Sequence, residues 1–161
     1  MRKIPLVTIP ALLALVATGC EPAVQETAAR TDSQVQADVD ALRSQWQELA
    51  NADDLAGVVA TYTEDAVYID QYGVVHDGRT AISAAFEQSL PLVSGYEIQT
   101  TATMSQGDMV VARGTWAATM TAPSGPTAMN GMWVTVGLYQ ADGSLKLRFH
   151  QGIIPATPPA M

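Results

Sequence analysis

The pattern of apolar residues changes at Pro91, and this change limits the possible folds more than any other feature of the chain. Before Pro91, apolar side chains recur every three or four residues, the period of helices that bury one face. After it, Thr, Val, Met and Trp are enriched in four segments, and Gly- and Pro-containing turns of the hairpin type separate them. These segments are residues 97–104, 109–120, 129–139 and 145–151. The order predicts an α+β domain with its helices on one face of the sheet.

Three helices are predicted before the sheet. The first has an apolar face with helical spacing, the second begins at Leu55 after an aspartate cap, and the third runs from Thr80 to Leu90. The face of the first helix consists of Val35, Val39, Leu42, Trp46 and Leu49. Residues 66–70 and 74–76 form a predicted short hairpin between the second and third helices. The expected fold is three N-terminal helices packed on a strongly bent antiparallel sheet.

The N-terminal residues have the character of an export signal. Arg2 and Lys3 precede an apolar run over residues 4–16, which is too short to span a bilayer as a helix. Small residues before Cys20, the only cysteine, make this segment similar to the signal of bacterial lipoproteins. That resemblance implies cleavage after residue 19, a lipid on Cys20, and attachment to a membrane of the cell envelope, at the periplasmic or outer-membrane face. The alternative is an ordinary signal peptide with an unrelated cysteine.

The rest of the chain divides by composition. Residues 20–33 are rich in Ala, Thr, Glu and Gln and are predicted to be a flexible tether. Residues 34–152 carry the periodic patterns and form the predicted domain. Residues 153–161 contain too many prolines for a helix or a central strand, so they are predicted to be a disordered tail.

Charge and residue counts exclude several classes of function. The chain has 16 acidic and 8 basic residues and a net charge of -8, which argues against nucleic acid as the main partner. One cysteine cannot form an intrachain disulfide. The two histidines, His76 and His150, have no metal-ligand spacing, and no phosphate-binding or dinucleotide-binding motif is present. We therefore expect neither a metal nor a cofactor.

Three short motifs carry a family resemblance. They are Ala-Asn-Ala-Asp-Asp-Leu ending at Leu55, Tyr-x-x-Asp-Ala-Val starting at Tyr62, and Gly-Arg-x-Ala-Ile starting at Gly78. At this spacing, over residues 35–152, the chain resembles the SnoaL-like polyketide cyclases and ketosteroid isomerases of the nuclear-transport-factor-2-like superfamily. The resemblance implies a cone-shaped fold that hosts enzymes and binding proteins alike. It also implies a homodimer, because members of this fold often pair through the sheet.

Asp70 and His150 are the candidate catalytic residues. By resemblance to ketosteroid isomerases, Asp70 falls at the position of the general base inside the cone. The other interpretation is that Asp70 begins the Asp70–Gly73 turn as a side-chain cap. In a regular strand Arg148 and His150 point to one face. That face is either the cone interior, where they would form a cationic floor, or the outer surface.

The remaining isomerase residues are missing. By the same resemblance, the family's oxyanion-hole tyrosine falls on Trp46 and its second acid falls near Thr135. We expect an apolar, aromatic lining instead, which suits small apolar ligands. The predicted ligand-binding residues are Trp46, Tyr68, Trp133, Thr135 and Arg148.

Two functions follow as hypotheses. The first is a lipid-anchored protein whose domain binds a small apolar or amphipathic molecule without turnover. The alternative is a proton-transfer enzyme of the isomerase, cyclase or dehydratase type with Asp70 as base.

Overall fold

The computed structural model describes residues 30–155. The predicted signal peptide, Cys20, most of the tether and most of the tail lie outside the described residues. The described helices are α1 (Asp32–Asn51), α2 (Leu55–Ala60), α3 (Gly78–Ser89) and the short 3-10 helix η1 (Leu90–Leu92). The strands are β1 (Tyr62–Ile69), β2 (Val75–Asp77), β3 (Val93–Gln106), β4 (Met109–Ala122), β5 (Gly125–Tyr139) and β6 (Leu145–Ile153).

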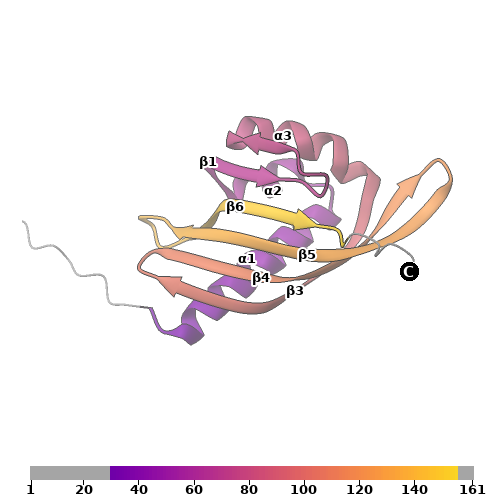
Figure 1. Cartoon of the computed structure of the whole chain (residues 1–161). Helices are drawn as coiled ribbons and strands as arrows, with labels where there is room; N and C mark the ends of the chain where they lie inside the picture. Colours follow the sequence, from indigo (N-terminus) through magenta and orange to yellow (C-terminus); the bar gives the residue numbers. More distant parts are fainter. Residues whose placement is uncertain (1–29, 156–161) are drawn as a thin grey trace, which may run out of the picture.

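One six-stranded sheet has the order β2-β1-β6-β5-β4-β3. Figure 1 shows α1 crossing behind the long strands and α3 lying beside β1 and β2. The α+β class and the curved sheet agree with the sequence prediction. Two details differ. The three helices are not all N-terminal, because β1 and β2 precede α3 where the short hairpin was predicted, and β1 is parallel to β6, which makes the sheet mixed. Helix α3 and four strands separate β1 from β6 in the chain, and local hairpin signals cannot reveal that pairing.

Side-chain caps place the helix starts. Thr31 caps α1, where its hydroxyl accepts from the Gln34 amide while the Gln34 side chain accepts from the Thr31 amide. Helix α1 therefore begins inside the stretch predicted to be a tether. Asp54 caps α2 by accepting from the Gly57 amide. A Cβ atom on Gly57 would lie 2.5 Å from Asp54 Oδ2, which explains the glycine in this short helix.

The concave face of the sheet packs against α1 and α3. One buried group joins α1, α2, α3, β1 and β6 around Tyr62, and a second joins α1 to β4 and β5 around Trp133. Two close approaches on this face require glycine. A Cβ atom at Gly114 would lie 1.8 Å from the Gln99 carbonyl oxygen, and one at Gly131 would lie 2.1 Å from the Ile153 carbonyl oxygen. These positions let strands and tryptophan rings approach closely where the sheet bends.

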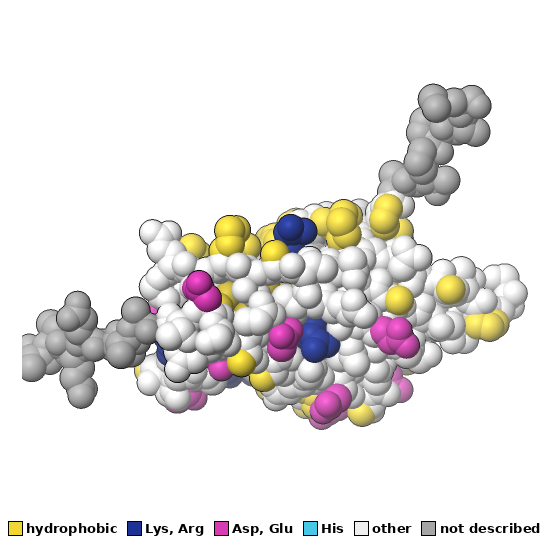
Figure 2. All heavy atoms as spheres, turned by 90° about the horizontal axis from the view of Figure 1, so that it is seen from below, with side chains coloured by type: hydrophobic (Ala, Val, Ile, Leu, Met, Phe, Trp, Pro, Cys, Tyr) yellow, Lys and Arg dark blue, Asp and Glu magenta, His cyan; other side chains and the backbone are white. Residues whose placement is uncertain are grey.

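No described helix covers the opposite, convex face of the sheet. One register row on this face is apolar across five strands, from Val67 through Phe149, Val136 and Val111 to Met104. Met104 is 70% exposed. Figure 2, which views the molecule from below, shows hydrophobic side chains gathered along its upper edge. The five residues of this register row, Val67, Phe149, Val136, Val111 and Met104, are called the convex row below.

Candidate functional site

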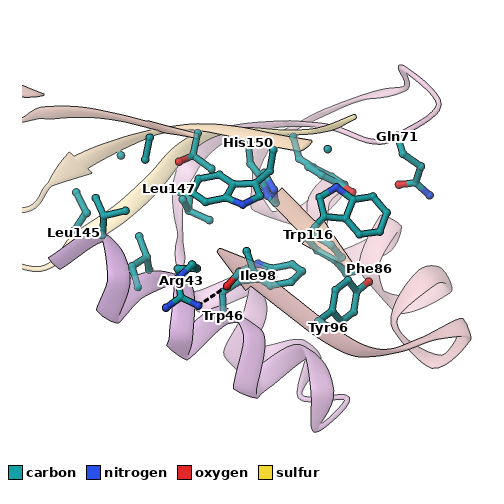
Figure 3. Close-up of a pocket in the computed structure, with 18 of the residues that line it drawn as sticks. Arg43, Trp46, Gln71, Phe86, Tyr96, Ile98, Trp116, Leu145, Leu147 and His150 are labelled. Carbon is teal, nitrogen blue, oxygen red and sulfur yellow. Dashed lines mark hydrogen bonds between the residues drawn. The ribbon is translucent and has the colours of Figure 1, made fainter. Parts of the chain in front are cut away.

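A cavity of about 120 Å³ lies between α1, α3 and the concave face of the sheet. Figure 3 shows Trp46 and Arg43 of α1 on one wall and His150 and Leu147 of β6 on the wall opposite. Most of the lining is apolar or aromatic. Side chains from every layer contribute, and they include Val39, Leu42, Trp46, Tyr68, Phe86, Tyr96, Ile98, Val110, Trp116, Trp133, Thr135, Leu147 and His150.

Small residues on the sheet create this space. Ala112, Gly137 and Gly152 line the cavity at positions where larger side chains would fill it. Around Gly152 the space is open, because a Cβ atom placed there would meet nothing within 4 Å. A cavity of about 150 Å³ accommodates benzene in another protein, so this one suits a molecule built around a single ring.

All three tryptophans of the chain line the cavity, but none of their indole N–H groups is free to donate a hydrogen bond to a ligand. Trp116 Nε1 donates to the Met132 carbonyl at 3.1 Å, and Trp133 Nε1 donates to the Thr115 carbonyl at 3.2 Å. Trp46 Nε1 donates to the Tyr62 hydroxyl at 3.3 Å. An indole has one N–H, so ligand oxygen atoms must bind elsewhere.

His150 carries the main polar atoms of the cavity. Its Nδ1 lies 2.6 Å from the Tyr62 hydroxyl, and its ring meets the Trp46 ring edge-on at 5.9 Å. Its Nε2 atom forms no hydrogen bond with any residue from 30 to 155, and it is not sealed from the cavity. Burial lowers the pKa of His150 to about 4, so the ring is neutral at pH 7.

Two tyrosines bring further hydroxyls to the same wall. Tyr68 and Tyr96 line the cavity, and their hydroxyls make no hydrogen bond within the described part of the chain. Burial raises the pKa of Tyr68, and burial with the nearby Asp53 charge raises the pKa of Tyr96 to about 12. Both phenols therefore keep their protons and can donate to a ligand oxygen.

Arg43 is the one permanently charged residue of the described lining. Its Nη1 donates to the Ile98 carbonyl at 2.6 Å, as drawn in Figure 3, and its Nε lies 3.5 Å from Asp40 Oδ1. The Asp40 carboxylate offsets the charge, and no aspartate, glutamate or lysine of the described chain lines the cavity. The cavity is therefore electrically neutral.

Asp70 lies at the rim, outside the lining. Its Oδ1 accepts from the Tyr72 and Val74 amides at 2.9 Å each, and its Oδ2 lies 3.4 Å from His76 Nε2. Burial alone raises the pKa of Asp70, but these hydrogen bonds outweigh it and lower the pKa below its usual range. The geometry is that of the turn cap, the second of the two interpretations open from the sequence, and Gln71 rather than Asp70 lines the cavity.

Arg148 does not share a face with His150. A β-bulge separates them, because Val136 pairs with Phe149 while the adjacent Gly137 pairs with Leu147. The extra residue breaks the alternation, so Leu147 and His150, three apart, both line the cavity. Arg148 instead donates to the Asp65 carbonyl and pairs with its carboxylate at 3.3 Å. The predicted cationic floor is absent from the described residues.

Five of the predicted residues lie on the cavity wall, namely Trp46, Tyr68, Trp133, Thr135 and His150. Ligand contact by these residues stays a prediction. Tyr62 is a core residue with no exposed surface, and its bond to His150 was not foreseen from the sequence. Phe86 and Tyr96 were not predicted as wall residues. A family motif begins at Tyr62, but no local signal shows its pairing with His150, which is 88 residues away.

Two further observations concern metals and membranes. No group of three potential metal ligands occurs within residues 30–155. None of the helices described there is both long enough and apolar enough to cross a bilayer.

Comparison with known proteins places this geometry in context. The family model described as a SnoaL-like domain matches residues 43–146. No curated protein shows significant similarity to the chain.

Solved structures share the fold. A ketosteroid isomerase-like protein from Erwinia carotovora atroseptica is 17% identical over 75% of this chain and 96% of its own, with a TM-score of 0.67. A protein of unknown function from Mycobacterium tuberculosis is 20% identical over 77% of this chain and 73% of its own, with a TM-score of 0.65. An NTF2-like protein with a cystatin-like fold from Novosphingobium aromaticivorans is 14% identical over 77% of this chain and 84% of its own, with a TM-score of 0.61.

Proposed function

We propose that this chain, which belongs to the SnoaL-like domain family, binds a small, uncharged, largely apolar molecule in its cavity. One observation carries the proposal: a cavity of about 120 Å³ with an aromatic lining has only neutral or charge-balanced polar groups facing it. Apolar walls with a few convergent polar atoms are the usual form of small-molecule sites. A charged ligand would lose its hydration there without a free counter-charge.

A variant that fills the cavity tests the proposal. Gly152→Leu places a side chain in the open space beside Trp133, its pairing partner, without a backbone clash. Native mass spectrometry of the protein purified from the cells that make it should show a bound small molecule in the wild type and none in Gly152→Leu. The matched control is Gln151→Leu, the neighbouring position on the other face of β6, which should keep the molecule. Wild-type protein that is empty and also fails to bind single-ring compounds contradicts the proposal.

A proton-transfer enzyme is the second candidate. The observation in its favour is the Asp70–His76 pair, a carboxylate and an imidazole next to the lining residue Gln71. This function predicts that the protein catalyses exchange of the methyl protons of acetophenone in D2O and that Asp70→Asn abolishes the exchange. The binding function predicts no exchange by either protein.

We further propose that a lipid on Cys20 anchors the protein to a membrane of the cell envelope. The support is the sequence pattern around Cys20. Metabolic labelling with a fatty acid should mark the wild type and leave Cys20→Ser unlabelled. An unlabelled wild-type protein rules out the anchor.

We also propose that a second copy of the chain packs on the convex row. The support is geometric, because an apolar row that crosses the sheet can pair with itself about a two-fold axis. Sedimentation should show a dimer for the wild type and for Thr80→Glu on the exposed surface of α3, and a monomer for Val136→Glu in the centre of the row. A monomeric wild type excludes this partner.

A further inference from the structure

A buried chain of hydrogen bonds crosses the domain from α1 to β6. Trp46 Nε1 donates to the Tyr62 hydroxyl at 3.3 Å, and the same hydroxyl lies 2.6 Å from His150 Nδ1. Tyr62 has no exposed surface. Its position on β1 between a helix and the last strand fixes both contacts at once.

The chemistry of the three groups sets the direction of this chain. An indole nitrogen can only donate, so the Tyr62 oxygen accepts from Trp46. The phenol has one proton of its own, and His150 Nδ1 is its acceptor. The reverse arrangement, with a proton on Nδ1, would leave the buried phenol proton without an acceptor among residues 30–155, which is costly. In a neutral imidazole with Nδ1 as acceptor, the proton is on Nε2.

The Nε2 atom is the part of His150 that the cavity can reach. It has no partner within the described part of the chain, and the Tyr68 ring lies 5.2 Å from the His150 ring on the same wall. Burial keeps the ring neutral, since the pKa of His150 is lowered to about 4. The cavity thus offers a fixed, uncharged N–H next to a phenol.

We propose that Tyr62 is a positioning residue that holds His150 as an Nε2–H donor and so makes the cavity select ligands with an uncharged acceptor oxygen. A ketone, ester or ether oxygen accepts that proton without burying a net charge. A carboxylate of the same shape would need a counter-charge, and Asp40 already pairs with Arg43. This inference rests on the proposed binding function for the ligand class, but the tautomer can be measured without any ligand.

Nitrogen-15 NMR of the full-length protein measures the tautomer. The chain has two histidines, and His76→Gln assigns the remaining signals to His150. We expect the Nε2–H form in the wild type, and a mixture of both tautomers in Tyr62→Phe. Tyr96→Phe is the matched control, because it removes a cavity phenol that does not bond to His150, and it should leave the tautomer unchanged.

Two results overturn the role of Tyr62: an Nδ1–H form in the wild type, or an Nε2–H form that persists in Tyr62→Phe. If Tyr62→Phe fails to fold, biosynthetic 3-fluorotyrosine replaces the variant. A more acidic phenol donates more strongly, so the Nδ1 signal of His150 should shift while the signals of His76 stay in place. An unshifted Nδ1 signal then overturns the role.

Three probes of similar shape test the selection. Acetophenone carries a neutral carbonyl, benzoate carries a carboxylate, and ethylbenzene has no acceptor. We expect acetophenone to bind at least about tenfold more tightly than the other two, the effect of one hydrogen bond to a buried donor. In Tyr62→Phe the affinity for acetophenone should fall in proportion to the fraction of His150 that still carries its proton on Nε2, about twofold for an equal mixture of tautomers, while the affinity for ethylbenzene should stay unchanged. Benzoate or ethylbenzene binding as tightly as acetophenone overturns the selection. If no probe binds, the proposed binding function fails, and the NMR result still decides the tautomer.

Discussion

The two histidines of this chain have opposite surroundings at the cavity and at its rim. Both rings pack against Tyr68, at 5.2 Å for His150 and 5.6 Å for His76. His150 faces the Tyr62 phenol and the apolar lining, whereas His76 lies beside the Asp70 carboxylate. The carboxylate that could activate an imidazole is used to hold a turn, and the imidazole inside the cavity has only uncharged partners. The two histidines therefore differ in their acid–base surroundings because their neighbouring side chains differ, although the residue type is the same.

The largest expected effect is in the core beside the cavity. Tyr62→Ala removes a side chain with no exposed surface together with the hydroxyl that joins Trp46 to His150. Its free energy of unfolding should fall by about 3 to 5 kcal/mol, the usual loss for a buried aromatic ring. Urea denaturation measures this loss, and a loss under about 1 kcal/mol would contradict the buried position of Tyr62.

The second effect is a pH dependence that arises from His150. The pKa of His150 is about 4 in the folded chain and about 6.5 in the unfolded chain. Between these two pH values only the unfolded chain binds a proton at this residue. The contribution of His150 to the free energy of unfolding is therefore at its full value above about pH 6.5. It decreases as the pH falls toward 4, by a total of about 3 kcal/mol.

Denaturation at several pH values separates this contribution from that of other groups. His150→Gln should lose it, so its stability should change less than that of the wild type between pH 6.5 and 4. His76→Gln should keep it. Equal pH profiles for the wild type and His150→Gln would place His150 in a solvated site and remove the contrast between the two histidines.

A smaller effect is expected at the rim. Asp70→Ala removes the acceptor for the Tyr72 and Val74 amides, so the free energy of unfolding should fall by about 1 to 2 kcal/mol. Asp70→Asn, which keeps an acceptor oxygen, should lose less. Acetophenone affinity, measured by calorimetry, should change less than about twofold in both variants, because Asp70 is outside the lining. A tenfold loss of affinity would make the rim part of the site.

The smallest effect is at the tip of the same turn. Tyr72 is 71% exposed and only its backbone amide bonds to Asp70. Tyr72→Ala should change the free energy of unfolding by less than about 0.5 kcal/mol. Thermal denaturation alongside Tyr62→Ala gives the direct comparison of one residue type in the core and at an exposed turn.

The sequence predicts the elements of this fold well because each has a local cause. Helical spacing predicts α1, and turn residues bound the four long strands to within a few residues. The pairing of β1 with β6 has no local cause, since it depends on how the curved sheet closes. Such pairing is set by tertiary packing, which single-sequence patterns do not record.

The site is less predictable than the fold for the same reason. Strand alternation places Arg148 and His150 on one face, and one bulge residue reverses the result. Asp70 is ambiguous, because a carboxylate before a turn satisfies both a cap and a catalytic motif. The aromatic wall is partly predictable, since Trp46 and Trp133 are among the residues predicted to bind a ligand and both line the cavity. Tyr96 lines the cavity and Tyr62 contacts His150 only because segments that are distant in the sequence meet in the fold.

The parallel contact between β1 and β6 also determines when this cavity can form. Strand β1 emerges early in synthesis, but its neighbour in the sheet is the last strand of the domain. The Tyr62–His150 bond closes a loop of 88 residues, so its formation depends on non-local contacts that raise the contact order and slow folding. A nascent chain that ends before β6 has an exposed edge on β1 and no His150. The cavity is therefore complete only after the final strand has been synthesised.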